Sequence, residues 1–170
     1  MDRYLLSRPA YRARQFFGAL WPRFNGNDHK EALRALGPSL SPLFESMPPH
    51  DQRHCFAVYR SLLARGVSDE HLLTAALLHD AGKGALAGGR IRLWHRVARV
   101  ILAATAPRTL RRLSKGRGGL ADLYHHSARG AVLAEAHGAH SEVVDLIARI
   151  DSDHAPDELL RLLRAADDSC

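Results

Sequence analysis

The chain has 170 residues, of which 46% are hydrophobic and 25% are charged, and its formal net charge is +6. This length fits one domain with a sizeable buried core. No apolar run approaches the about 20 residues of a bilayer-spanning helix, and arginines interrupt the N-terminal stretch where a secretory signal would be continuously apolar. The two cysteines, Cys55 and Cys170, show no metal-pair spacing and no sign of an oxidising compartment. These features exclude membrane-spanning and disulfide-stabilised classes and predict a cytoplasmic protein with free thiols.

Helical periodicity in every strongly apolar segment, without alternating strand patterns, predicts an all-α fold. We expect Asp51, Ser68 and Ser141 to be N-caps, Pro156 to take the first position of the last helix, and Gly138 to end a helix. Flexible loops are expected at 84–89 and 116–119. The expected helices span residues 3–20, 28–36, 41–47, 51–66, 68–79, 91–106, 108–115, 120–125, 127–137, 141–150 and 156–168.

The most informative stretch runs from Ala75 to Lys83, where an apolar helix ends in His79, Asp80, Gly82 and Lys83. Burying two adjacent ionisable groups beside an apolar run is costly unless something pairs with them. A metal ion would remove that cost. The alternative is an ordinary helix end, with a histidine favoured by the helix dipole and a glycine cap.

Positive charge is concentrated between Asp80 and Asp122, an interval without any acidic residue. A segment of one charge sign suggests anionic partners, such as phosphorylated substrates, nucleic acid or an acidic membrane surface. A solvated basic surface is the alternative. The interval contains Lys83, Arg90, Arg92, Arg96, Arg99, Arg108, Arg111, Arg112, Lys115 and Arg117.

Several histidines and aspartates share one trait, because each lies at a helix end or break beside apolar neighbours. A single histidine of this kind is usually structural, but a set on separate elements favours a metal site. Histidine and carboxylate ligands without thiolates suit Mn, Fe, Co, Ni or Mg, and zinc also fits with fewer ligands. The set is His54, His79, Asp80, His126, Asp153 or His154, and Asp167.

The order of these residues resembles the HD superfamily of metal-dependent phosphohydrolases, over roughly Asp51 to Asp168. The resemblance includes the context of residues 77–83, 126–131 and 163–167, where the last segment carries an Ala-Asp pair. It implies a single-domain helical bundle of the HD type. Residues 51–170 would form the phosphohydrolase domain, and residues 1–50 an N-terminal helical extension packed on its core.

The resemblance also implies roles for individual residues. His54, His79, Asp80 and Asp167 would hold one divalent ion. Asp80 would bridge to a second ion held by His126 and His154. His126 is preferred over His125 because Gly130-Ala131 follows it at the family spacing. Asp80 and Lys83 are the expected catalytic residues, and the expected substrate-binding residues are Lys83, Arg90 and Arg129.

Departures from family patterns narrow the substrate. No Gly-Tyr-Pro stretch follows His154, which disfavours cyclic-dinucleotide phosphodiesterases. No Glu-Asp pair follows Asp80, which disfavours guanosine tetraphosphate hydrolases. Lys83 stands where single-metal deoxynucleotidases of the family carry a glutamate. The His-Asp-x-x-Lys form looks like the two-metal branch, which includes dinucleoside polyphosphate hydrolases.

We therefore expect a hydrolase whose metal-activated water attacks the phosphorus of a nucleotide or another small phosphoester or phosphoanhydride. The expected partner is an anionic phosphorylated small molecule, with Lys83 contacting its phosphoryl oxygens. One alternative is a non-catalytic HD module that holds a metal and senses a nucleotide. A less favoured alternative is a basic protein that binds nucleic acid or an acidic membrane surface.

Overall fold

The computed structural model describes residues 26–87, 98, 101–102, 105–114, 119–152 and 157–170. These residues form eight α-helices and two short 3-10 helices, with no strand among them, so the predicted all-α fold is confirmed. None of the described helices is both long and apolar enough to cross a membrane. The predicted helix at 3–20, and most of the one at 91–106, fall outside the described residues.

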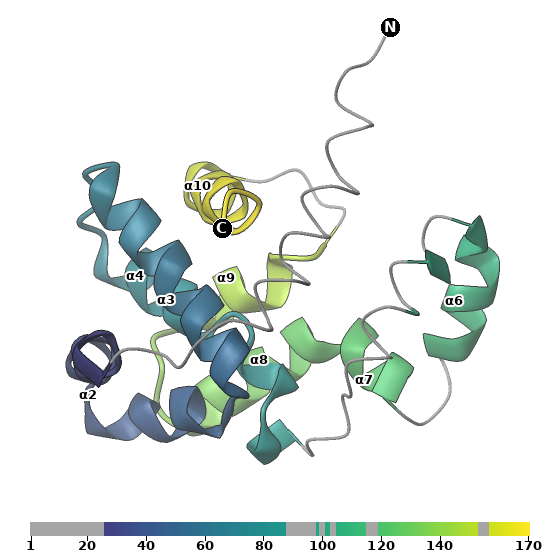
Figure 1. The fold of residues 1–170 in the computed structure, drawn as a ribbon, viewed down its shortest axis with the longest axis horizontal. Coiled ribbons are helices and arrows are strands. Elements are labelled where there is room, and N and C mark those ends of the chain that lie inside the picture. Colours follow the sequence, from purple (N-terminus) through teal and green to yellow (C-terminus); the bar gives the residue numbers. More distant parts are fainter. Residues whose placement is uncertain (1–25, 88–97, 99–100, 103–104, 115–118, 153–156) are drawn as a thin grey trace, which may run out of the picture.

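The helices are arranged so that the ends of several of them meet near the middle of the molecule (Figure 1). α6 and α7 lie on one side, away from α2, α3 and α4 on the other. The elements are α2 (Gly26–Ser46), α3 (Pro49–Ala64), α4 (Glu70–Leu78), η1 (Ala81–Lys83), η2 (Ala85–Ala87), α6 (Pro107–Ser114), α7 (Gly119–Tyr124), α8 (His126–Ala136), α9 (Ser141–Arg149) and α10 (Glu158–Asp167).

One hydrophobic core joins α2, α3, α4, α8, α9 and α10. Its fully buried side chains come from both ends of the described chain, and include Phe44 of α2, Leu62 of α3, Leu77 of α4, Ile147 of α9 and Leu163 of α10. The described part of the predicted extension, from residue 26 onward, therefore packs into the same core as the rest of the chain. The domain boundary at residue 50 stays a prediction.

α2 is broken at Gly37, in the interval between the predicted helices at 28–36 and 41–47. Gly37 has φ 68° and ψ 178°, a left-handed conformation that glycine adopts without strain, and the helix kinks there. The second half of α2 begins directly after this kink, earlier than the predicted start at Ser41. The Ser41 hydroxyl instead donates to the Gly37 carbonyl at 2.7 Å.

The predicted starts of α3 and α4 are wrong by one or a few residues. α3 begins at Pro49, because proline suits the first helical position, so Asp51 is not its cap but a buried residue in its first turn, 3.4 Å from His50. Asp69, not Ser68, caps α4 by accepting from the Leu72 N–H at 2.8 Å.

The later caps shift in the same way. His140, not Ser141, is the N-cap of α9, and its Nδ1 accepts from the Glu142 N–H at 3.3 Å. Asp157 caps α10 by accepting from the Leu160 N–H at 2.9 Å, so Pro156 lies before the helix, outside the described residues. The expected loop at 84–89 contains the 3-10 helix η2.

Candidate metal centre

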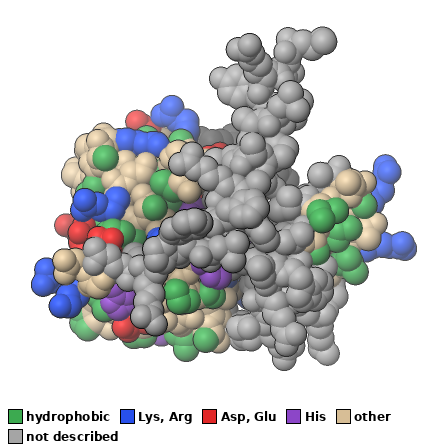
Figure 2. Space-filling view, viewed as in Figure 1, with side chains coloured by type: hydrophobic (Ala, Val, Ile, Leu, Met, Phe, Trp, Pro, Cys, Tyr) green, Lys and Arg blue, Asp and Glu red, His purple; other side chains and the backbone are tan. Residues whose placement is uncertain are grey.

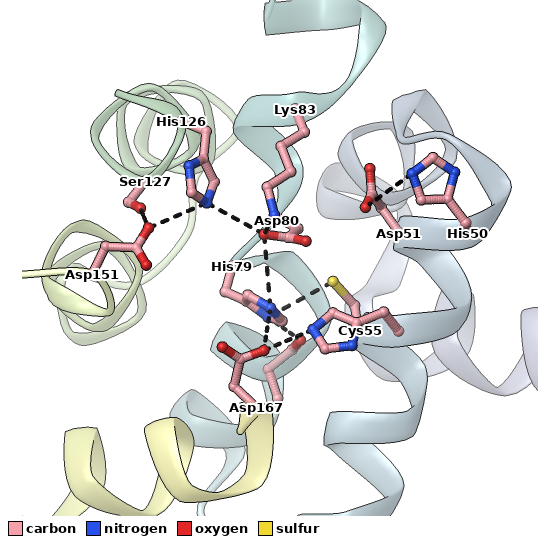
Figure 3. Close-up of polar contacts among 12 residues, drawn as sticks. His50, Asp51, Cys55, His79, Asp80, Lys83, His126, Ser127, Asp151 and Asp167 are labelled. Atoms are coloured by element: carbon pink, nitrogen blue, oxygen red, sulfur yellow. Dashed lines mark hydrogen bonds and ion pairs between the residues drawn. The ribbon is translucent and has the colours of Figure 1, made fainter. Parts of the chain in front are cut away.

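The side chains of the candidate centre come from three helices, α3, α8 and α10, and from the residues that directly follow α4. Figure 3 labels His79, Asp80, His126 and Asp167 among them. His54 lies in the first two turns of α3, and His79 and Asp80 directly follow α4. His126 is the first residue of α8, and Asp167 is the last residue of α10. α3, α4, α8 and α10 all pack their apolar sides into the shared core, which brings these residues together.

His54, His79 and Asp167 form the first group. Asp167 Oδ1 lies 2.7 Å from His54 Nε2 and 3.4 Å from His79 Nε2. The two imidazole rings meet edge to face, with centroids 5.4 Å apart. Burial opposes ionisation of Asp167, but contact with both histidines holds its pKa well below the usual range. Asp167 is therefore an anion that faces two imidazoles.

Asp80 is the centre of the second group. Its Oδ1 lies 2.5 Å from Lys83 Nζ, 3.4 Å from His126 Nε2 and 3.8 Å from His79 Nε2. The residue is only 4% exposed. Burial opposes its ionisation, but Lys83, His79 and His126 hold its pKa well below the usual range. One buried carboxylate oxygen is thus shared by an ammonium group and two imidazoles.

Backbone carbonyls orient the two buried imidazoles. His79 Nδ1 lies 2.9 Å from the Ala76 carbonyl, and His126 Nδ1 lies 2.8 Å from the Leu123 carbonyl. Because a carbonyl only accepts, each Nδ1 carries the proton and each Nε2 of a neutral ring presents a lone pair. This is the arrangement in which metal-ligating histidines are held by their second nitrogen.

The Nε2 atoms of His79 and His126 face carboxylate oxygens, which cannot donate a hydrogen bond to a nitrogen lone pair. His79 Nε2 is buried and has no hydrogen-bond partner among the described residues. His126 Nε2 lies between Asp80 at 3.4 Å and Asp151 at 3.3 Å, so its lone pair faces two carboxylates. A cation between these atoms would turn repulsion into attraction. The nitrogen and oxygen donors present therefore fit a divalent metal ion.

A proton on His79 would supply part of such a positive charge. Burial opposes protonation of His79, but the carboxylates of Asp80 and Asp167 raise its pKa well above the usual range. Cys55 Sγ lies 3.7 Å from His79 Nδ1. Burial raises the pKa of the Cys55 thiol, although His79 opposes this, so the thiol stays protonated.

Asp151 was missed by the sequence analysis. It follows α9, and its Oδ2 accepts from the Ser127 hydroxyl at 2.6 Å as well as lying beside His126. The Arg164 guanidinium holds this turn by donating to the carbonyls of Arg149, Ile150 and Ser152 at 2.7 to 2.8 Å. The sequence signal was the interval between the predicted helices at 141–150 and 156–168, where Asp153 or His154 was the predicted ligand.

A close backbone approach holds η1 against α8. A Cβ added at Gly82 would lie 1.8 Å from the His126 carbonyl oxygen, and one added at Gly130 would lie 3.1 Å from Gly82 N. Only glycine at position 82 allows this contact. This backbone contact keeps Asp80 and Lys83, which are close to Gly82 in sequence, next to His126.

The remaining predicted site residues are placed as follows. His154 and Arg90 lie outside the described residues, as does Asp153. Arg129 is in the first turn of α8 and pairs with Asp122 at 2.6 Å. Of the basic segment, the described side chains of Arg108 and Arg112 are exposed. On the face drawn in Figure 2, the described Lys and Arg side chains are dispersed around the rim, without a single basic patch.

No family model, curated protein or solved structure matches the chain. The roles of these residues as metal ligands therefore stay predictions that depend on the geometry and on the resemblance of the motif.

Proposed function

We propose that this protein is a metal-dependent phosphohydrolase of the HD type, acting on a nucleotide or another small phosphoester or phosphoanhydride. The position of Asp80 Oδ1 supports this most strongly, because it lies between His79 Nε2 and His126 Nε2 at 3.8 and 3.4 Å. A carboxylate with an imidazole on either side is what two neighbouring metal ions would share. An ordinary helix end would not need a second buried histidine aimed at the same oxygen.

The proposal assigns two ligand groups. His54, His79 and Asp167, together with Asp80, would hold the first ion. His126 and Asp151 would hold the second, again with Asp80, and His154 remains a predicted ligand outside the described residues. All of these donors are nitrogen or oxygen, which suits the divalent ions Mn, Fe, Co, Ni and Mg and also admits zinc.

Lys83 is the candidate for substrate contact. Its side chain is 14% exposed, and its ammonium group neutralises the buried Asp80. When metal charge satisfies Asp80, Lys83 would be able to turn to a phosphoryl oxygen as a point charge. Arg129 and Arg90 remain proposed contacts for the rest of an anionic substrate, with Arg129 held at present by Asp122.

The chemistry is hydrolysis at phosphorus. A divalent ion at such a site lowers the pKa of water toward neutrality and stabilises charge on attacking and leaving oxygens. The chain itself would orient the ligands through the carbonyls of Ala76 and Leu123, and would neutralise the phosphoryl group through Lys83.

The test compares two adjacent histidines. Protein purified without chelators is analysed for metal and assayed on a panel of nucleotides and other phosphoesters. Saturated with Mn²⁺, which is not one of the late first-row ions that bind surface histidine pairs best, the wild type should bind about two equivalents. His126→Ala should bind about one and lose most hydrolysis, because a ligand of the second ion is removed. His125→Ala is the matched control and should keep both, since His125 is an exposed residue outside the centre.

Other outcomes distinguish the alternatives. If the wild type binds one equivalent at saturating metal, or if His126→Ala changes neither stoichiometry nor rate, the two-metal form is wrong. Bound metal without turnover on the whole panel would favour the nucleotide-sensing module. Binding to nucleic acid or acidic vesicles that falls with salt and ignores chelators would favour the basic binding protein.

A further inference from the structure

A second cluster of ligand-type side chains lies outside the candidate centre. His71 is in the first turn of α4, His140 is the N-cap of α9, and Glu142 is in the first turn of α9. The imidazoles of His71 and His140 are stacked, with centroids 4.1 Å apart and planes 6° from parallel. Glu142 Oε2 lies 4.0 Å from His71 Nε2. One ligand atom from each of the three lies within 4.8 Å of the others.

We propose that His71, His140 and Glu142 form a second, surface binding site for a late first-row divalent cation such as Zn²⁺ or Ni²⁺. Two imidazoles and one carboxylate are suitable ligands for these ions, with water in the remaining positions. Metal–ligand bonds of about 2.0–2.2 Å bring cis ligand atoms to within about 3.5 Å of each other. Small side-chain rotations close the present separations of 4.0 to 4.8 Å.

The arrangement is partly preformed. Stacking holds the two rings together, so an ion meets a pair of imidazoles and not two independent side chains. The side chains of His71 and Glu142 are 38% and 46% exposed, which leaves room for both the ion and its water ligands. An ion bound to His140 Nδ1 would replace the hydrogen bond from the Glu142 N–H, which is long at 3.3 Å and exposed to solvent.

The proposed site lies between the first turns of two helices, α4 and α9. α4 and α9 pack against each other, and both helices run from this cluster toward the candidate metal centre. His71 precedes His79 by eight residues, or about 12 Å along a helix. An ion bound here would join the first turns of the two helices that carry His79-Asp80 and Asp151 at their other ends. The site does not depend on the proposed function.

Calorimetric titration with Zn²⁺ tests the proposal on the wild type and on His71→Ala, His140→Ala and Glu142→Gln. In each histidine variant we expect the affinity for one zinc equivalent to fall at least about tenfold. Glu142→Gln should show a smaller loss of affinity. His137→Ala is the matched control, because it removes a histidine three residues from His140 that is outside the cluster and bonded to the Leu133 carbonyl. It should titrate like the wild type.

A local readout separates this site from the candidate centre. Zn²⁺ should slow the modification of His71 and His140 by diethyl pyrocarbonate, mapped by mass spectrometry, and leave that of His137 unchanged. Hydrolysis, where present, should persist in His71→Ala. The proposal is overturned if the three variants bind as many zinc equivalents as the wild type with unchanged affinity, or if zinc leaves the modification of His71 and His140 unchanged. If a histidine variant melts abnormally before metal is added, the zinc titration of Glu142→Gln takes its place as the test.

Discussion

At the scale of single residues, His79 is the point where a proton and a metal ion would compete. Its Nδ1 donates to a backbone carbonyl, and its buried Nε2 faces Asp167 at 3.4 Å and Asp80 at 3.8 Å. In the metal-free protein these neighbours raise the pKa of His79 well above its usual range, against the effect of burial. A metal ligand must be a neutral imidazole, so the ion can bind only by displacing that proton.

This competition predicts opposite pH trends for the metal-free and the metal-loaded protein. Because the folded pKa of His79 is raised, its protonation stabilises the metal-free fold fully below the unfolded value near 6.5, and this contribution is lost as pH rises through the folded pKa. The melting temperature in chelator should therefore fall as the pH rises from about 6.5. The rise in melting temperature on adding Mn²⁺ should grow over the same range.

The aspartates should not disturb this measurement. The pKa values of Asp80 and Asp167 are lowered, so their contributions are present above the unfolded value near 4 and are lost only as the pH falls below it. His125→Ala, with its exposed ring, should show the same two trends as the wild type. A metal-induced shift that is constant with pH would show that no protonated histidine is displaced.

At the scale of elements, the candidate centre depends on how closely η1 approaches α8. The Gly82 backbone contacts the His126 carbonyl so closely that an added Cβ would lie 1.8 Å from the oxygen. His126 and the pair Asp80 and Lys83 are therefore held in contact by backbone packing as well as by charge. This packing helps to hold Asp80 Oδ1 at 3.4 Å from His126 Nε2.

Gly82→Ala should consequently damage both the fold and the centre. Overpacking of this kind costs about 1–3 kcal/mol, and it moves His126 away from Asp80. Gly130→Ala should be milder, since its added Cβ would lie 3.1 Å from Gly82 N and 3.3 Å from Ile147. Denaturant unfolding measures the loss of stability, and metal analysis measures the loss of the second equivalent.

Gly26→Ala supplies the control, because an added Cβ at Gly26 has no atom within 4 Å. It should leave stability and metal content close to the wild type. If Gly82→Ala binds metal and unfolds like Gly26→Ala, then the close approach of η1 and α8 has no part in forming the centre.

Helix positions were predicted better than helix ends. Leucine and alanine at helical spacing were enough to predict α4 and α10, because burial of an apolar face decides the period. The caps were harder, since Ser68 and Asp69, or His140 and Ser141, are adjacent and both able to accept a hydrogen bond. The local sequence does not show which of two such neighbours the packed helix selects.

The same limit explains why Asp151 was missed. Adjacent residues at a helix end point about 100° apart, so a shift of one residue decides whether a carboxylate faces the centre. Here Arg164, on another helix, fixes the turn after α9 through three backbone carbonyls. A contact between residues far apart in sequence therefore selects Asp151, and no local pattern contains that information.

At the scale of the whole molecule, the helices before and after residue 50 share one core. Phe44 and Leu43 of α2 are fully buried in the same cluster as Leu77 of α4 and Leu163 of α10. The predicted extension contributes large apolar side chains to this cluster and does not merely cover it. We expect the described segments to unfold together, as small single domains usually do.

Two core substitutions test this cooperativity. Phe44→Ala should lower the free energy of unfolding by about 3–5 kcal/mol and Leu163→Ala by about 2–5 kcal/mol. In both variants, circular dichroism and alkylation of the buried Cys55 thiol should report the same single transition in denaturant. Val132→Ala is the control, because Val132 is 64% exposed, and its effect should stay within about 0.5 kcal/mol. A separate early transition in Phe44→Ala alone, with the main transition unmoved, would instead make residues before 51 an independent unit packed on the rest.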